Sequence, residues 1–456
     1  MTENSRVPGG GRPLREWRDR HGVPHQERRA APRTDEPRVQ RVVGPLEAAW
    51  RKGNEPGAQS SVITGAAGDG DHLVESERHS LLAQEALERP NPHIEPDPDD
   101  SERSLWTWVI EDADARAIVL WVNPVFDFRD AREAEFTRLP GSDLWTICLR
   151  LSSALRASYR IASWYEEGPP PWRTAVGRRN VILAARDPGL PDPRGVHTIR
   201  GSWGQESSIG AGPLAPVELW RVSTERPAPA SSRLDELTLP DGERAWVYSP
   251  GQVEAPTPLL VLFDGQVWKG VGLPEILDIV IAAGHLPPLH VALLDSRDRD
   301  HRWAKTGVPG GQVDTVIDHL LPRVRANWAV DPSGDSTLVS GQSLGGMASL
   351  WTLALSEGEV QHAIAQSASL WRFDIAEPLL NEPRWRSLEL QAGTCEGAML
   401  PTAQALEASL RADQRLGHRT VRTTGFEAGH DWAVWRANLI NTLADRFRPQ
   451  TAVQQA

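Results

Sequence analysis

The sequence contains a serine in a short glycine-rich motif that is typical of a catalytic nucleophile. Residues 341–345 read Gly-Gln-Ser-Leu-Gly, with Ser343 at the centre. The motif follows a short predicted strand at 337–340 and opens a predicted helix at 345–355, which is the context of a nucleophile elbow. Its glycines allow the sharp turn that exposes a serine hydroxyl at the end of a sheet. The motif therefore predicts a catalytic serine; the alternative is a glycine-rich helix N-terminus that binds a phosphate or only turns the chain.

A serine hydroxyl is a poor nucleophile at neutral pH and needs a general base. His430, in Gly-His-Asp-Trp at 429–432, lies just beyond the predicted strand at 419–423. This position fits the chain order serine, acid, histidine. We therefore expect His430 to accept the proton of Ser343. The other interpretation is a loop histidine that caps the last helix.

The acid that orients this imidazole should follow the predicted strand at 388–391. Glu396, in Gly-Thr-Cys-Glu-Gly at 393–397, lies there. Its carboxylate would fix the tautomer of the imidazole and stabilise the imidazolium. Asp431 is too near His430 in sequence to orient it. Other acidic residues in this half of the chain are rivals for the role, namely Asp374, Glu382 and Asp413.

An oxyanion hole requires two backbone N–H donors. Leu344, directly after the serine, is expected to supply one of them. The loop after the predicted strand at 259–263 is expected to supply the other, from Gly265, Gln266 or Val267. The alternative for this loop is a simple turn between a strand and a helix.

The elements that must position these residues alternate from residue 233 onward. Strands are predicted at 244–248, 259–263, 289–294, 337–340, 362–366, 388–391 and 419–423. Helices are predicted at 274–283, 313–328, 345–355, 404–410 and 432–447. This alternation predicts a mainly parallel sheet covered on both faces. With the serine motif, it predicts the α/β class and an α/β-hydrolase catalytic domain at 233–450.

The preceding part of the chain has a different pattern. Short stretches rich in β-branched and aromatic residues predict strands at 105–111, 117–122, 144–151 and 157–164. They indicate a small β-sandwich domain at 102–225, followed by a linker at 227–232. Residues 1–100 are expected to be a largely disordered or loosely packed lead-in. In particular, the proline-rich run at 89–100 is expected to lack regular structure.

Composition excludes several functional classes. The 456-residue chain has a net charge of −12, which argues against general binding to nucleic acid. Its only cysteines, Cys148 and Cys395, fall in different predicted domains and make no zinc site. Residues 1–20 show no secretory signal, and no apolar stretch reaches the length of about 18 residues that suggests a membrane span. We therefore expect a cytoplasmic protein without membrane insertion or a metal site.

The order of these motifs resembles that of the enterochelin esterase family, also called ferric enterobactin esterases. The resemblance spans roughly residues 100–447. It is carried by residues 138–145, 262–268, 294–296, 341–346, 366–371 and 429–431, with Arg302, Trp435 and Arg436.

The resemblance implies a serine esterase that hydrolyses the trilactone ester bonds of a ferric catecholate siderophore such as ferric enterobactin. Cleavage lowers the affinity for iron and releases it inside the cell. Ser343 and His430 match the catalytic pair of the family, and Glu396 matches an acidic position. No cofactor is implied, because the iron arrives as part of the small-molecule substrate.

The resemblance also suggests residues that bind the substrate. Arg302 matches a family arginine, and a guanidinium suits an anionic catecholate complex; its other interpretation is a surface salt bridge. Trp268, Trp371 and Trp432 could form aromatic walls, although core packing explains each of them equally well.

Two other functions are weighed against this one. The first is a general esterase D-like carboxylesterase that acts on feruloyl or acetyl esters and uses the β-domain as an accessory module. The second is a non-catalytic binding protein on a hydrolase scaffold, which the order of serine, acid and histidine disfavours.

Overall fold

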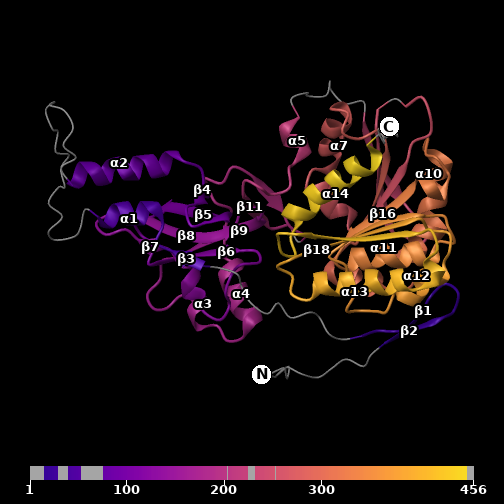
Figure 1. Ribbon diagram of the computed structural model, residues 1–456, viewed down its shortest axis with the longest axis horizontal. Helices are drawn as coiled ribbons and strands as arrows, with labels where there is room; N and C mark the ends of the chain where they lie inside the picture. Colours follow the sequence, from indigo (N-terminus) through magenta and orange to yellow (C-terminus); the bar gives the residue numbers. More distant parts are fainter. Residues whose placement is uncertain are drawn as a thin grey trace, which may run out of the picture.

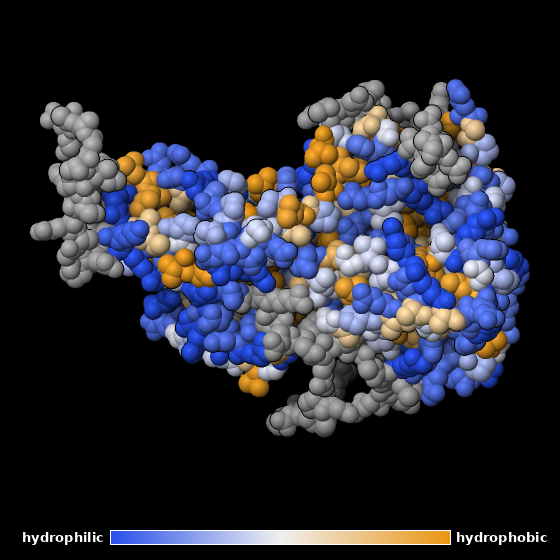
Figure 2. Space-filling model, viewed as in Figure 1, coloured by the Kyte–Doolittle hydropathy of each residue, from blue (hydrophilic) through white to orange (hydrophobic). Residues whose placement is uncertain are grey.

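Two domains make up the computed structural model, which describes residues 15–28, 40–52, 75–202, 204–223, 232–251 and 253–448. The N-terminal β-domain and the C-terminal catalytic domain lie side by side (Figure 1). No helix in these described ranges is long and apolar enough to cross a membrane. Figure 2 shows a mostly hydrophilic surface on the face viewed, with hydrophobic residues in small separate groups.

The catalytic domain contains a sheet of eight strands in the order β12-β13-β15-β14-β16-β17-β18-β19. In that order the bounds are Arg233–Thr238, Arg244–Ser249, His290–Leu294, Leu259–Leu262, Thr337–Gln342, His362–Gln366, Ser387–Gly393 and Thr420–Phe426. The pairings of β13 with β12 and with β15 are antiparallel, and the other pairings are parallel. Parallel strands bring their carboxyl ends to one edge, which is where ligands bind in such sheets.

Helices cover both faces of this sheet. One face carries α9 (Gln312–Asp314), a π-helical turn (Thr315–Leu320), α10 (Leu321–Asn327), α11 (Leu344–Leu355), α12 (Ala376–Asn381) and α13 (Met399–Ala412). The other carries α6 (Gly265–Gly270), α7 (Leu273–Ala282) and α14 (Trp432–Phe447). The short helix α8 (Arg299–Lys305) follows β15. The mainly parallel, doubly covered sheet confirms the predicted fold class.

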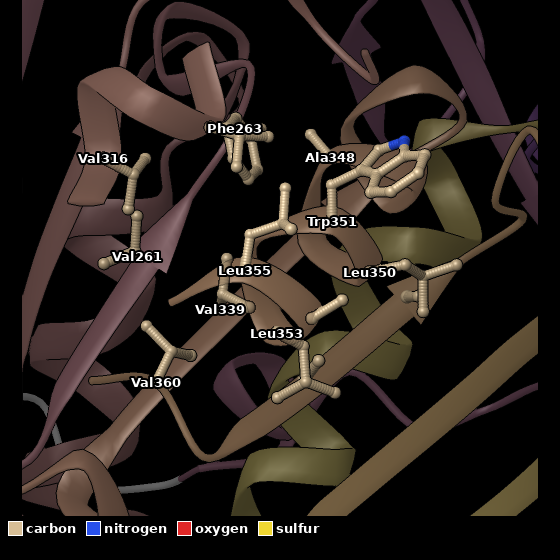
Figure 3. Close-up of a cluster of buried hydrophobic side chains, with 14 of the residues drawn as sticks. Val261, Phe263, Val316, Val339, Ala348, Leu350, Trp351, Leu353, Leu355 and Val360 are labelled. Carbon is tan, nitrogen blue, oxygen red and sulfur yellow. The ribbon is translucent and has the colours of Figure 1, made fainter. Parts of the chain in front are cut away.

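Helix α11 is buried along its whole length. Figure 3 shows Leu350, Trp351 and Leu353 of this helix among the side chains of Val261 and Val339 from the central strands. Burial of large apolar side chains stabilises a fold by roughly 1.5–3 kcal/mol each. The helix that begins after Ser343 is therefore anchored in the core, and it cannot shift without disturbing that packing.

The β-domain is a sandwich of two sheets. One has the order β10-β11-β9-β6, with bounds Thr198–Arg200, Glu206–Ala211, Arg156–Trp164 and Ala117–Val122. The other has the order β3-β8-β5-β4, with bounds Gln40–Val42, Leu144–Ser152, Asp100–Glu111 and His93–Asp97, and β7 (Thr137–Arg138) pairs with β8. A core that includes Trp106, Trp108 and Tyr159 fills the space between the sheets. This agrees with the predicted β-sandwich.

Four helices described in this domain cover the outside of the sandwich. Helices α3 (Pro171–Thr174) and α4 (Arg178–Arg186) pack on β6 and β9, whereas α1 (Pro45–Arg51) and α2 (Glu75–Glu88) lie over the other sheet. Helix α5 (Leu219–Val222) lies between the two domains in sequence and packs on α7 and α14.

The prediction that residues 1–100 are disordered or loosely packed is wrong for the parts that the structure describes. A hairpin of β1 (Glu16–Arg18) and β2 (Pro24–Gln26) lies on the catalytic domain beside α12 (Figure 1). There Trp17 packs against the core, and the His25 ring meets Trp351 edge-on with ring centroids 4.7 Å apart. The rest of this N-terminal prediction concerns residues that lie outside the described ranges.

The proline-rich run at 89–100 also differs from its prediction, because residues His93–Asp97 form strand β4. This strand lies at the edge of its sheet and pairs only with β5 among the described strands. An edge strand tolerates proline because one side of its backbone needs no partner strand, and the register shifts beside Pro96.

Candidate active site

Ser343 lies in the tight turn between β16 and α11. Its backbone has φ 58° and ψ −115°, a conformation that residues with a side chain rarely adopt. A Cβ atom at Gly341 would lie 2.5 Å from the carbonyl of Gly345. A Cβ atom at Gly345 would lie 3.1 Å from the Cβ of Phe263. A side chain at residue 341 would therefore collide with the turn itself, and one at residue 345 would press on Phe263, directly after β14.

His430 lies in the loop between β19 and α14, and its Nδ1 is 2.9 Å from Oε2 of Glu396. The carboxylate is 2% exposed, whereas the imidazole is 46% exposed. Glu396 follows β18, the strand next to β19. The other carboxylate oxygen, Oε1, accepts the hydroxyl of Ser367 at 2.7 Å and the N–H of Gly393 at 3.0 Å. The buried carboxylate is thus fixed, and it orients the half-exposed imidazole.

The three rival acids lie elsewhere. Asp374 is an exposed partner of Arg28, Glu382 pairs with Arg384, and Asp413 pairs with Arg415. In contrast, Ser343, His430 and Glu396, the residues predicted for nucleophile, base and acid, line one cavity, in which His430 and Glu396 are in direct contact.

Two serines that sequence reasoning missed support this group. The indole N–H of Trp435 donates to the Oγ of Ser367 at 2.9 Å, and Ser367 in turn donates to Glu396. The Trp435 ring also meets the His430 ring edge-on, with centroids 4.6 Å apart. Ser369 Oγ lies 3.5 Å from Ser343 Oγ. The stretch at 366–371 belongs to the family resemblance, but nothing local in the sequence indicates which partner each serine meets.

The N-terminus of α6 lies beside the elbow. Strand β14 pairs with β16 up to Leu262 and Ser340, and a Cβ atom at Gly345 would lie 3.2 Å from the carboxylate of Asp264. The first N–H groups of a helix lack partners within the helix. Leu344 is the first residue of α11, and Gly265 and Gln266 are the first two residues of α6. The backbone N–H groups of all three therefore belong to helix N-termini.

One of the predicted oxyanion donors is already in use. The N–H of Val267 donates to the carbonyl of Asp264 at 2.9 Å. Its prediction as an oxyanion donor is therefore wrong. The side chain of Gln266 is also engaged, because it donates to the hydroxyl of Ser296 at 2.7 Å and accepts the N–H of the same residue at 3.0 Å. The backbone N–H groups of Leu344, Gly265 and Gln266 are left as candidates.

Arg302 does not line the cavity at Ser343. Its guanidinium forms a two-pronged ion pair with Asp264, at 2.6 and 2.7 Å, and also donates to the carbonyl of Gln342 at 3.3 Å. Burial lowers the pKa of Arg302, but the carboxylate of Asp264 outweighs this and raises it. The prediction of Arg302 as a substrate-binding residue is not supported; it joins the ends of two strands behind the elbow.

A cavity of about 390 Å³ lies at the junction of the two domains and contains Ser343, Glu396 and His430 in its lining. The β-domain contributes an aromatic and cationic wall, with Trp121, Phe126, Phe128 and Arg178. The guanidinium of Arg178 lies over the Phe128 ring, 5.1 Å from its centroid. No local signal in the sequence marks these residues, since a β-domain strand end and a short helix carry no catalytic motif.

The predicted tryptophans have different places. Trp371 of the catalytic domain lines the cavity, and its ring stacks on Trp303 with centroids 6.2 Å apart. Trp268 is fully buried and Trp432 nearly so; their rings meet edge-on in the core, 5.2 Å apart. The prediction of these two as substrate walls is wrong, because packing of the sheet and its helices buries them. No cluster of potential metal ligands occurs within the described residues.

Comparison with known proteins gives the same two domains. A family model described as the enterochelin esterase N-terminal domain matches residues 105–221, and one described as a putative esterase matches residues 243–446. The iron(III) enterobactin esterase of Dickeya dadantii is 27% identical over 402 residues, which cover 78% of this chain and 90% of that protein. The iron(III) salmochelin esterase of Escherichia coli O6:H1 is 25% identical over 364 residues, covering 72% of this chain and 83% of that protein.

Solved structures agree on the fold. The crystal structure of the enterobactin esterase from Shigella flexneri in the presence of enterobactin superposes with a TM-score of 0.67 at 22% identity. The superposition covers 80% of this chain and 97% of the Shigella flexneri chain. The ferric enterobactin esterase from Salmonella typhimurium gives a TM-score of 0.66 at 22% identity. This superposition covers 79% of this chain and 98% of the Salmonella chain.

Proposed function

The chain belongs to the enterochelin esterase family, and we propose that it hydrolyses the trilactone ester bonds of a ferric catecholate siderophore such as ferric enterobactin. The observation that carries the proposal is one cavity in which Ser343 and His430 face an aromatic and cationic wall from the β-domain. Relatives named as esterases of iron(III) enterobactin and of iron(III) salmochelin support the same substrate class.

The proposed reaction is acyl transfer to Ser343. Nε2 of His430 accepts the Ser343 proton as Oγ attacks the ester carbonyl carbon. Glu396, on the other side of the ring, stabilises the imidazolium that forms. The imidazolium then donates its proton to the leaving alkoxide, and the C–O bond breaks to give an acyl-enzyme. Water, deprotonated by the same nitrogen, attacks the acyl carbon and releases the carboxylate together with free Ser343.

The negative charge of each tetrahedral intermediate forms near the N-termini of α11 and α6. The N–H of Leu344 and that of Gly265 or Gln266 are the proposed donors. A preorganised donor of this kind contributes about 3–4 kcal/mol to transition-state stabilisation. Both helix termini are held by packing, and Arg302 joins Asp264 to the carbonyl of Gln342 beside them. The charge-stabilising groups therefore need little reorganisation during the reaction.

The chemistry of the cavity supports a substrate that is both aromatic and anionic. Trp121, Phe126, Phe128 and Trp371 offer flat apolar surfaces of the kind that pack against catechol rings. Arg178 supplies a cation whose guanidinium can pair with catecholate oxygens and stack on their rings. No cofactor is needed in this proposal, because iron enters and leaves with the small-molecule substrate. Release of iron for use by the cell implies a cytoplasmic location, which the low cysteine content supports.

Incubation of the purified full-length chain with ferric enterobactin, and separately with the iron-free triester, tests the proposal. Mass analysis should detect linear hydrolysis products from the wild type and none above background from Ser343→Ala. Feruloyl and acetyl esters serve as comparators. Efficient turnover of these esters without cleavage of any catecholate triester would overturn the proposed substrate and leave a general carboxylesterase.

A further inference from the structure

The loop that carries His430, residues 427–431, touches the β-domain on two sides. On one side Asn123, just after β6, donates from Nδ2 to the backbone carbonyl of His430 at 3.0 Å. On the other side the β9 backbone meets the two ends of the loop: the N–H of Arg156 donates to the carbonyl of Glu427 at 3.3 Å, and the N–H of Ser158 donates to Oδ2 of Asp431 at 2.7 Å.

The two regions of the β-domain that touch this loop, the end of β6 and strand β9, are themselves hydrogen-bonded. The N–H of Asn123 donates to the carbonyl of Ser158 at 2.9 Å, which ties the end of β6 to β9. Asp431, which is 4% exposed, uses its second oxygen to accept the N–H of Ala433 at 2.9 Å and so caps α14. Burial raises the pKa of its carboxyl group. Asp431 thus connects β9 of the β-domain to both the loop at 427–431 and the first turn of α14.

The two domains approach each other closely at Gly429, the residue before His430. A Cβ atom there would lie 2.5 Å from Cβ and 2.8 Å from Cγ of Pro124. Gly429 is not among the glycines with positive φ. Glycine is therefore required here by lack of space and not by backbone conformation, and the obstacle is a rigid ring from the other domain.

We propose that the β-domain positions the catalytic base, through contacts of Asn123, Pro124 and Ser158 with the histidine loop. The inference rests on the proposed role of His430. Glu396 fixes Nδ1, but the distance from Nε2 to the serine also depends on where the loop backbone lies. A misplacement of about 1 Å can reduce the rate by about 10²-fold. The β-domain therefore affects kcat for every ester, including esters too small to touch the cavity wall that it supplies.

The sharpest test uses Gly429→Ala with p-nitrophenyl acetate, a small ester, and with a fluorophosphonate that labels the serine. We expect kcat for the ester and the rate of labelling to fall by about 10²-fold, with KM nearly unchanged. Pro124→Gly removes the opposing ring, so the double variant Gly429→Ala/Pro124→Gly should regain at least tenfold of the loss. Full activity of Gly429→Ala, or a loss that Pro124→Gly does not relieve, overturns the proposal.

A second, milder variant keeps the test decisive if Gly429→Ala does not fold. Asn123→Ala should lower kcat for p-nitrophenyl acetate about threefold to tenfold, in line with one lost hydrogen bond. Asn441→Ala is its matched control, since Asn441 donates to the carbonyl of Val217 at the same distance of 3.0 Å, away from the loop. Equal kcat values for the two variants would contradict the proposal.

The siderophore assay separates this inference from the proposed function. If the wild type hydrolyses p-nitrophenyl acetate but no catecholate triester, the proposed substrate fails. The effects of Gly429→Ala and Asn123→Ala on the small ester still decide whether the β-domain positions His430. If Ser343 or His430 is not needed for the small ester, both ideas fail together.

Discussion

Nδ1 of His430 lies 2.9 Å from Oε2 of Glu396, although the two residues are 34 positions apart in the chain. They meet because they follow β18 and β19, which are parallel neighbours whose carboxyl ends share one edge of the sheet. The carboxylate is buried and held by Ser367 and Gly393, so the imidazole is oriented by a fixed partner.

Substitution of this carboxylate by an amide tests its role. Glu396→Gln should lower kcat by about 10²–10⁴-fold, because the amide keeps the shape but does not stabilise the imidazolium. Asp374→Asn, at a rival acidic position that is exposed and paired with Arg28, should leave kcat unchanged. Steady-state kinetics with p-nitrophenyl acetate and with ferric enterobactin provide the measurement. The reverse ranking of the two variants would mean that the acid has been wrongly assigned.

Removal of the serine hydroxyl has both a kinetic and a structural consequence. Ser343→Ala and Ser343→Gly should each reduce kcat by at least about 10⁴-fold, and neither should react with a fluorophosphonate. Because residue 343 has φ 58°, the glycine variant should be more stable than the alanine variant by about 1 kcal/mol. Urea unfolding of the pair measures this difference. Equal stability would show that the elbow backbone relaxes when the hydroxyl is removed.

Arg178 should matter for the charge of the substrate. Arg178→Gln should raise KM for the ferric complex by about tenfold, the effect expected for loss of one charged hydrogen bond. The increase for the iron-free triester should be smaller, because its catechols are less ionised. Arg179→Gln makes the same charge change on α4 at a residue that does not line the cavity. If both variants raise KM equally, long-range charge explains the effect and no direct contact is needed.

The N-terminal hairpin should contribute to the stability of the catalytic domain. Glu27 lies 3.0 Å from the guanidinium of Arg372, which is 1% exposed and also donates to the carbonyls of Trp303 and Thr306. Glu27→Gln leaves that buried cation without its anion and should cost about 3 kcal/mol in the free energy of unfolding. Glu16→Gln breaks an exposed pair in the same hairpin and should cost less than about 1 kcal/mol. Chemical denaturation of both variants gives the comparison, and similar losses would show that Arg372 is satisfied by the carbonyls alone.

Mild acid should destabilise the fold through His362. Burial lowers the pKa of this histidine from 6.5 to about 4, so the unfolded chain binds its proton first as the pH falls. Stability should therefore decrease from pH 6.5 downward, by about 2 kcal/mol between pH 7 and pH 5. His362→Gln should flatten this part of the profile, whereas His418→Gln, at an exposed position, should not. Urea unfolding at several pH values is the measurement. A slope that His362→Gln leaves intact would assign the acid sensitivity to other groups.

The class of fold and the chain order of the proposed catalytic residues could be predicted from the sequence alone. The apolar stretches of the catalytic domain are short and separated by turns, so their alternation indicates a parallel sheet before any contact is known. The elbow at Ser343 is local, since a strand, a turn with glycines on both sides and a helix lie within one continuous stretch. His430 and Glu396 could be proposed because parallel strands deliver the residues that follow them to one edge.

The partner of each polar side chain, in contrast, depends on how distant segments pack together. The family resemblance predicts that Arg302 faces the substrate, but its side chain lies against Asp264. Arg178, on a helix of the other domain, lines the cavity instead. The hairpin at 15–28 lacks a long periodic pattern, and its position depends on a distant surface around Arg372. The cause is physical: periodicity and turn residues report the conformation of a continuous stretch of chain. A cavity between two domains depends on packing between segments that are hundreds of residues apart, which no local pattern encodes.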